Sequence, residues 1–207
     1  ARFVADHRTV AVAGTSGKST VVAMIFEILR GAGRRPSVIT GGELISLQRQ
    51  GLMGNAYKDT GSDLLVIEAD ESDGSLVHYR PAVGVVLNLQ KDHKEEREVA
   101  ALFERFRARC YQAFVTGEDA NLAPYAAGSA IFGLGPGATV RGKGVTLEPA
   151  GSRFAIEEVV FRLPVPGRHN VENALAAIAA CRAVGVEPAE MTAPLERFAG
   201  VARRFQT

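Results

Sequence analysis

The sequence is poor in cysteine. Its 207 residues include only Cys110 and Cys181. Two widely spaced thiols argue against a disulfide framework and against a cysteine-based metal site, and they are typical of proteins from a reducing compartment. We therefore expect a cytoplasmic location. The chain also shows no internal repeat and no low-complexity segment, so a repeat architecture is not expected.

Charge of one sign and long apolar runs are also absent. The chain has 24 basic and 23 acidic side chains, for a formal net charge of +1. This balance gives no electrostatic reason to expect a nucleic-acid or membrane partner. No apolar run approaches the length of a transmembrane helix, and the N-terminus lacks a signal-peptide pattern. The chain begins with Ala1 rather than Met, and we expect it to be a fragment of a longer protein.

The apolar content of 46% is enough for a substantial core. Short apolar runs typical of buried strands alternate with helical patterns in the first half of the chain. This alternation predicts a mostly parallel sheet with right-handed crossovers, which binds ligands at the carboxyl ends of its strands. The expected strands are 9–13, 37–40, 63–68, 82–89 and 113–116, the expected helices are 18–30 and 95–109, and 43–61 reads as a loop.

The pattern changes from about Ser129. Four short strand-like segments with glycine turns between them predict a smaller antiparallel extension rather than further parallel units: 130–133, 139–142, 145–149 and 153–163. An apolar helix is expected over 170–184, and a last helix begins near Pro188, where Pro194 is expected to kink or split it. The predicted fold class is therefore α/β, a P-loop-type, mostly parallel sheet flanked by helices with this extension in the C-terminal half.

The strongest motif is Gly14-Thr15-Ser16-Gly17-Lys18-Ser19-Thr20, which joins the first predicted strand to the first predicted helix. Strand, glycine loop and helix with Lys-Ser at its start is the layout of a phosphate-binding P-loop. The two glycines let backbone N–H groups approach phosphate oxygens, the lysine bridges phosphates, and the Ser19 hydroxyl can ligate Mg²⁺. The sequence therefore predicts binding of ATP or GTP with magnesium.

The usual pattern has a further glycine, and Val12 stands in its place. The loop is thus the variant G-T-x-G-K-[S/T]. The other interpretation of this segment is an ordinary strand-to-helix turn with a solvated lysine.

Acidic and polar side chains follow the next two predicted strands. Glu68-Ala-Asp70-Glu71-Ser72-Asp73 gathers four carboxylates after a buried strand, which suits a metal ligand beside a P-loop or, alternatively, a solvated turn with a helix cap. Asn88-Leu-Gln-Lys-Asp92-His93 follows the other strand. His93 could bind a metal, act as a base or contact phosphate, but a lone histidine in a charged loop is usually solvent-exposed.

Two further motifs lie near the end of the chain. Gly167-Arg168-His169-Asn170-Val-Glu-Asn173 opens a predicted helix and places its two asparagines on one face. They could hydrogen-bond a nucleotide base, or Asn170 could serve as the helix N-cap. Arg203 and Arg204 could clamp a phosphate, or could be an ordinary surface pair.

In this order the five motifs resemble the central domain of the Mur ligases, over essentially the whole chain. E-A-D-E-S-D and G-R-H-N-x-x-N point to the alanine-adding and muropeptide-recycling branches of that family. The resemblance implies ATP bound by residues 14–20, His169, Asn170, Asn173 and Arg204. It implies Mg²⁺ held by Ser19, Glu68 and His93, with Lys18 and His93 as the catalytic residues. Alanine-adding members generally carry His and Thr where this chain has Ser16 and Ser19.

The resemblance also implies a reaction. Similar enzymes phosphorylate a substrate carboxylate with ATP, and an amine then attacks the acyl phosphate. The implied partners are a UDP-N-acetylmuramate-type sugar nucleotide and an amino acid, L-alanine by this resemblance. Residues 1–207 would form the single ATP-binding domain, without the UDP-binding and amino-acid-binding domains of the family. Two other functions stay open, a ligase that adds a whole peptide and a P-loop nucleotide switch without ligase activity.

Overall fold

The computed structural model describes residue 4 and residues 6–70, 75–89 and 96–202. Its centre is an eight-stranded sheet with the strand order β4-β2-β5-β1-β6-β7-β8-β9. All pairs in this sheet are parallel except β2 with β4. The strands are β1 (Arg8–Ala13), β2 (Ser37–Ile39), β4 (Ala56–Tyr57), β5 (Leu64–Glu68), β6 (Val83–Val86), β7 (Ala113–Gly117), β8 (Ala130–Gly133) and β9 (Val140–Arg141). The predicted parallel α/β sheet is confirmed.

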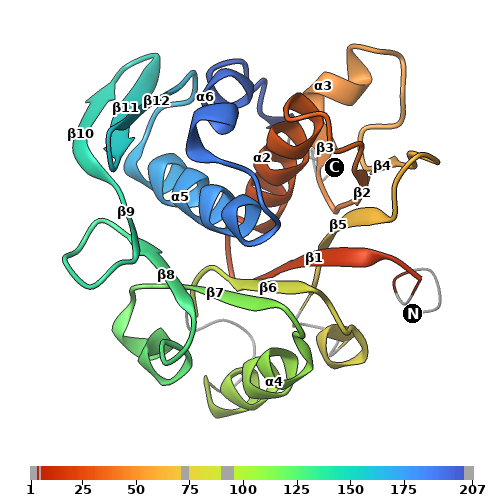
Figure 1. Ribbon diagram of the computed structural model, residues 1–207, viewed down its shortest axis with the longest axis vertical. Helices are drawn as coiled ribbons and strands as arrows, with labels where there is room; N and C mark the ends of the chain where they lie inside the picture. The colour runs from red at the N-terminus through yellow and green to blue at the C-terminus, as the bar shows by residue number, and fades with distance from the viewer. Residues whose placement is uncertain (1–3, 5, 71–74, 90–95, 203–207) are drawn as a thin grey trace, which may run out of the picture.

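Helices cover both faces of the sheet (Figure 1). On one face lie α2 (Lys18–Gly31), α5 (Arg168–Ala183) and α6 (Pro188–Glu196), and on the other lies α4 (Glu96–Arg109) with the short 3₁₀ helices η1 (Ser75–His78) and η2 (Ala120–Tyr125). The buried side chains form two clusters, one on each face of the sheet. β1 shows why: Val10 and Val12 join the cluster under α2, whereas Ala11 and Ala13 join the cluster under α4. This follows from the two-residue period of a strand.

A second, three-stranded antiparallel sheet has the order β10-β11-β12 and lies beside α5 and α6 (Figure 1). Its strands are β10 (Lys143–Glu148), β11 (Gly151–Ile156) and β12 (Val159–Leu163). The expected antiparallel extension is therefore present, but it is shorter than predicted. The segments 130–133 and 139–142 do not belong to it, because β8 and β9 continue the main sheet in parallel. A short glycine-containing link between strands is typical of a hairpin, and here it joins parallel neighbours instead.

The segment 43–61 is not the continuous loop that was expected. It contains β3 (Glu43–Leu44), α3 (Ile45–Gln48) and β4. β3 pairs with β13 (Val201–Ala202) in a two-stranded antiparallel sheet. Local sequence does not predict this pairing, since the partner strand lies at the other end of the described chain.

Pro194 does not split the last helix, because it lies inside α6. The proline ring packs against the end of α2 at Gly31. A Cβ atom added to Gly31 would stand 2.4 Å from Cγ of Pro194. The missing side chain therefore permits the close approach of α2 and α6.

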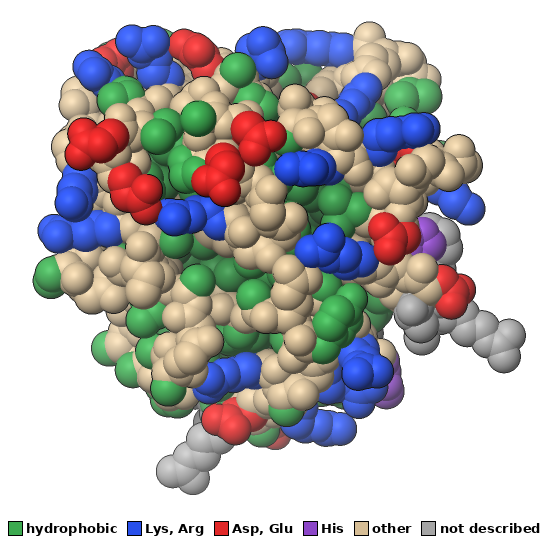
Figure 2. Space-filling view, viewed as in Figure 1, with side chains coloured by type: hydrophobic (Ala, Val, Ile, Leu, Met, Phe, Trp, Pro, Cys, Tyr) green, Lys and Arg blue, Asp and Glu red, His purple; other side chains and the backbone are tan. Residues whose placement is uncertain are grey.

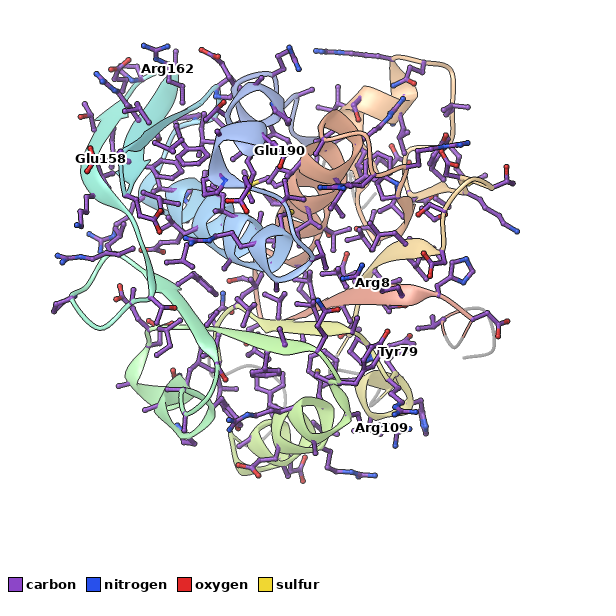
Figure 3. The ribbon with its side chains drawn as sticks, viewed as in Figure 1. Arg8, Tyr79, Arg109, Glu158, Arg162 and Glu190 are labelled. Carbon is purple, nitrogen blue, oxygen red and sulfur yellow. The ribbon has the colours of Figure 1, made fainter. Side chains whose placement is uncertain are left out.

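Two arginines make hydrogen bonds near the amino ends of the strands, at the edge of the sheet opposite the P-loop. Arg8, at the start of β1, donates to the side chain of Gln112 at 3.0 Å, and Nε of Arg109 donates to the carbonyl of Tyr79 at 3.1 Å (Figure 3). Basic and acidic side chains are interspersed over the face shown in Figure 2, in keeping with the balanced composition. No helix among the described residues is both long and apolar enough to span a bilayer.

Both cysteines are free thiols. Cys181 is fully buried in α5, and burial raises its pKa. Burial also raises the pKa of Cys110, which follows α4, to about 12. Both groups are therefore protonated at neutral pH, and neither is an activated thiolate.

We predict that Gly31→Ala destabilises the domain. The new methyl group meets a rigid proline ring, and overpacking of this kind costs about 1–3 kcal/mol. For a domain of this size the melting temperature should fall by about 2–4 °C per kcal/mol, measured by calorimetry. Gly137→Ala is the matched control, because Gly137 has open space around it. Adding Pro194→Ala should restore part of the loss, and equal melting temperatures for the two single variants would contradict the packing argument.

Candidate active site

The P-loop lies at the carboxyl end of β1, between two strands that also end there, β5 and β6. Gly14 and Gly17 both have positive φ, 130° and 89°, a region that other residues rarely adopt. Each is also closely surrounded: an added Cβ would stand 3.0 Å from Cβ of Leu87 at Gly14, and 2.6 Å from Oδ1 of Asn173 at Gly17. The two glycines of the motif are therefore required by backbone geometry and by contacts from α5 and from the residues that follow β6.

Helix α2 begins directly after Gly17, which is its N-cap without a side-chain cap bond. The first bond of the helix runs from the Val21 N–H to the Gly17 carbonyl, at 3.0 Å. The N–H groups of a first helical turn have no earlier carbonyl within the helix to bond, so they and the helix dipole favour an anion there. The observed start at Lys18 confirms the predicted strand, loop and helix layout.

A cavity of about 370 Å³ opens at this helix start, lined by residues 15–20 together with Glu68 and Asp70. Nζ of Lys18 lies 3.9 Å from Oδ1 of Asp70. The lysine side chain is 13% exposed and the aspartate 51%, so the cation lies inside the cavity and its partner at the mouth. The structure thus brings together the two motifs that the sequence placed after β1 and β5.

One carboxylate oxygen beside this cavity accepts three hydrogen bonds. Oε2 of Glu68 accepts hydrogen bonds from the Ser19 hydroxyl at 2.8 Å, the Thr40 hydroxyl at 2.8 Å and the Gly41 N–H at 2.9 Å. A hydroxyl and a carboxylate beside phosphate-binding amides are the hard oxygen ligands that Mg²⁺ takes, with the remaining positions filled by phosphates and water. Ser19 and Glu68 therefore fit the predicted magnesium site.

Thr40 and Gly41 were not among the site residues predicted from the sequence. They follow β2, which pairs with β5, so the sheet order places them beside Glu68. The only signal in the sequence was the Gly41-Gly42 pair at the end of a short predicted strand. Gly42 is also tightly packed, since an added Cβ would stand 2.5 Å from Cγ1 of Val201 and 3.0 Å from Cβ of Ser19.

Asn88 is a second residue whose role the sequence did not disclose. It follows β6, and its side chain pairs with the peptide of Ser16 in the P-loop. The Ser16 N–H donates to Oδ1 of Asn88, and Nδ2 of Asn88 donates to the Ser16 carbonyl, both at 3.0 Å. The Asn88 carbonyl also accepts from the Thr15 N–H at 3.4 Å.

A larger cavity of about 670 Å³ adjoins the first and shares Ser16, Gly17 and Thr20 with it. His169, Asn170 and Asn173, which the family resemblance predicts as nucleotide contacts, line it. Its other walls include apolar side chains from several elements: Leu87, Phe132, Val165 and Phe198. The lining also includes the carboxylates of Glu118, Asp119 and Glu172, and such a mixture of apolar and polar groups can bind a small organic ligand. The pair of cavities therefore suits a nucleotide, with the phosphates at α2 and the base beside α5.

The N-cap interpretation of Asn170 is wrong. α5 begins at Arg168 with Gly167 as its N-cap, so Asn170 lies within the first turn. Its Nδ2 donates to the Pro166 carbonyl at 2.7 Å. The Asn170 side chain therefore bonds the turn that precedes the helix and also lines the larger cavity.

Several predicted residues lie outside the described residues, namely His93, Arg203, Arg204, Glu71 and Asp73. Within residues 6–70, 75–89 and 96–202, no group of three or more His, Cys, Asp or Glu side chains could hold a metal ion. Of the predicted magnesium ligands, Ser19 and Glu68 lie among the described residues.

Comparison with known proteins places this site in a family. The family model of the Mur ligase middle domain matches residues 12–181. A UDP-N-acetylmuramate–L-alanine ligase from Thermobifida fusca is 36% identical over 95% of this chain and 44% of its own length. The corresponding ligase from Stenotrophomonas maltophilia strain K279a is also 36% identical, over 99% of this chain and 45% of its own length. The chain thus spans less than half the length of these relatives.

Solved structures agree. UDP-N-acetylmuramate-alanine ligase MurC from Thermotoga maritima has a TM-score of 0.83 and 30% identity, covering 96% of this chain and 46% of that one. UDP-N-acetylmuramate:L-alanyl-gamma-D-glutamyl-meso-diaminopimelate ligase (MPL) from Neisseria meningitides has a TM-score of 0.79 and 26% identity, covering 97% of this chain and 68% of that one. The family match, the curated relatives and these structures cover the P-loop, the acidic motif and the α5 motif together. This chain belongs to the Mur ligase family and has the fold of its middle domain.

Proposed function

We propose that this chain is the ATP- and magnesium-binding domain of a ligase that joins L-alanine to UDP-N-acetylmuramate. The reaction proceeds through an acyl phosphate, with ADP and phosphate as the other products. The main support is one arrangement: Lys18, Ser19 and Glu68 surround a single cavity at the start of α2. The curated relatives described above carry the name of this activity.

Each residue has a distinct task in this proposal. Lys18 lies at the cavity wall, where its charge would stabilise the phosphoryl group as it moves to the carboxylate. Ser19 and Glu68 would hold magnesium, which neutralises phosphate charge when bound, and the family resemblance adds His93 as a third ligand. His169, Asn170 and Asn173 would contact the nucleoside, and Arg204 would reach the phosphates. Residues 14–17 would form the loop that surrounds the phosphates, and the N–H groups at the helix start, with Thr20, would bind them.

The sugar nucleotide and the amine would bind in parts of the protein outside this chain. The chain matches only 44–45% of the two curated relatives, which leaves room for UDP-binding and amino-acid-binding domains. We propose a cytoplasmic reaction, which suits two free thiols.

A second candidate is a ligase that adds a whole peptide to the same sugar nucleotide. It is supported by the similarity to the solved MPL structure. The two candidates differ in the amine, whose binding residues lie outside this chain, so substrate tests have to separate them. The P-loop switch is less well supported, because the whole set of motifs follows the order of the Mur ligases.

The first prediction concerns the substrates. In the full-length protein, ADP release from Mg·ATP should require both UDP-N-acetylmuramate and L-alanine, and hydroxylamine should trap the acyl phosphate as a hydroxamate. Release that needs the tripeptide L-alanyl-γ-D-glutamyl-meso-diaminopimelate instead of L-alanine would support the second candidate. Hydrolysis without any acceptor dependence and without a hydroxamate would overturn both ligase proposals.

The second prediction concerns Lys18. Lys18→Ala should lower kcat by about 10²–10³-fold, the usual effect of removing one charge-stabilising group. Lys143→Ala removes an exposed lysine from β10, outside the two site cavities, and should leave kcat unchanged. Steady-state kinetics of ADP release measures both variants. Normal turnover by Lys18→Ala would remove this lysine from the mechanism.

The third prediction concerns Thr40. Thr40→Val keeps the shape of the side chain but removes the hydroxyl that donates to Glu68. Loss of such a supporting bond should raise the Mg²⁺ concentration for half-maximal activity by about tenfold. Thr40→Ser, which keeps the hydroxyl, is the matched control and should stay near the wild-type value. An unchanged magnesium dependence in Thr40→Val would show that Glu68 does not need this bond.

A further inference from the structure

Hydrogen bonds within the protein connect the P-loop to the residues that follow β6. Oδ1 and Nδ2 of Asn88 bond the N–H and the carbonyl of Ser16, both at 3.0 Å. A primary amide presents one acceptor and one donor side by side, so it can bond two groups of a backbone at once. The Asn88 backbone adds a third bond, from the Thr15 N–H to its carbonyl, at 3.4 Å.

The surrounding packing is built to permit this pairing. The Leu87 N–H bonds the Ala13 carbonyl at 3.0 Å, which continues the β1–β6 ladder up to the loop. Gly14 then passes so close to the segment after β6 that an added Cβ would stand 3.1 Å from the backbone nitrogen of Asn88. Because Gly14 has no side chain, the loop and the end of β6 can approach to hydrogen-bond distance.

Because of this pairing, the backbone N–H groups of the loop and of the helix start point in two directions. Those of Thr15 and Ser16 are directed at Asn88. The N–H groups of the first turn of α2 face the cavity at the helix start instead. A phosphate chain would therefore be bound by the helix start, while Asn88 fixes the loop in the shape that the phosphates meet.

We propose that Asn88 is a positioning residue for the phosphates, acting through the peptide of Ser16 rather than through the base. This inference rests on the proposed ATP-dependent function. Its effect should appear in phosphate affinity, because a loop without the clamp has to be ordered again each time a nucleotide binds. The rate of the phosphoryl transfer itself depends on Lys18 and the metal ligands, so kcat should change less than the KM for ATP.

The structure supplies a matched control in Asn121. Its Nδ2 donates to the carbonyl of Leu89, one residue beyond Asn88, but no hydrogen bond from it to the P-loop is found among the described residues. Asn121→Ala and Asn88→Ala each remove a side-chain amide that secures the same segment. Only Asn88→Ala removes a bond to the loop.

The test measures three quantities in the full-length protein: the KM for ATP, the inhibition constant of inorganic tripolyphosphate, and the KM for UDP-N-acetylmuramate. In Asn88→Ala the first two should rise together by about tenfold, equivalent to about 1.4 kcal/mol, while the third stays unchanged. Asn121→Ala should leave the first two within about twofold of wild type, since it removes no hydrogen bond to the loop itself.

Three results would overturn the inference. Equal rises in both variants would mean that the segment is merely loosened. A rise for ATP without a rise for tripolyphosphate would mean that Asn88 acts on the base, since it also lines the larger cavity. No rise in either quantity would mean that the clamp is dispensable. Calorimetric binding of tripolyphosphate reports on the loop even if the wild-type protein shows no ligase activity, so the failure of this inference and of the proposed function can be told apart.

Discussion

The site depends on a single atom, Oε2 of Glu68, which accepts three hydrogen bonds from two other segments of the chain. Ser19 comes from the start of α2, whereas Thr40 and Gly41 come from the turn after β2. Bonds to an ionised carboxylate are stronger than those between neutral groups, and three of them define its orientation. The orientation of Glu68, which would hold magnesium in the proposed function, is therefore set by the protein itself, and this reduces the ordering that ligand binding has to supply.

The sheet makes that convergence possible. β5 lies between β2 and β1, and the three run in parallel, so their carboxyl ends meet along one edge. β6 flanks β1 on the other side and brings Asn88 to the P-loop. The strands are short and mostly buried, and polar residues lie at or just after their carboxyl ends. The same topology that buries the apolar runs thus delivers a carboxylate, an amide and a helix start to one place.

The parts of the site that could be predicted from the sequence are those whose residues are contiguous in the chain. The P-loop and its helix could be predicted because strand, glycines, Lys18 and Ser19 are contiguous. Thr40 and Asn88 could not be assigned roles, since each depends on which strands are neighbours in the sheet. β8 and β9 were misassigned for a related reason: short glycine-linked strands look alike whether they pair in parallel or antiparallel fashion. β3 escaped prediction because its partner is β13, near residue 202.

That last pairing shows that the site extends beyond its motifs. β13 crosses next to Gly42, where only a glycine leaves room between Val201 and Ser19. Val201, Gly200 and Phe198 also line the larger cavity. One segment therefore borders this cavity and packs against Gly42 beside Ser19. A shift of this segment could not occur without changing the packing around Gly42 and Ser19, because the interior is close-packed. The chain after α6 therefore borders the larger cavity and the start of α2, although its sequence up to Ala202 contains no recognisable binding motif.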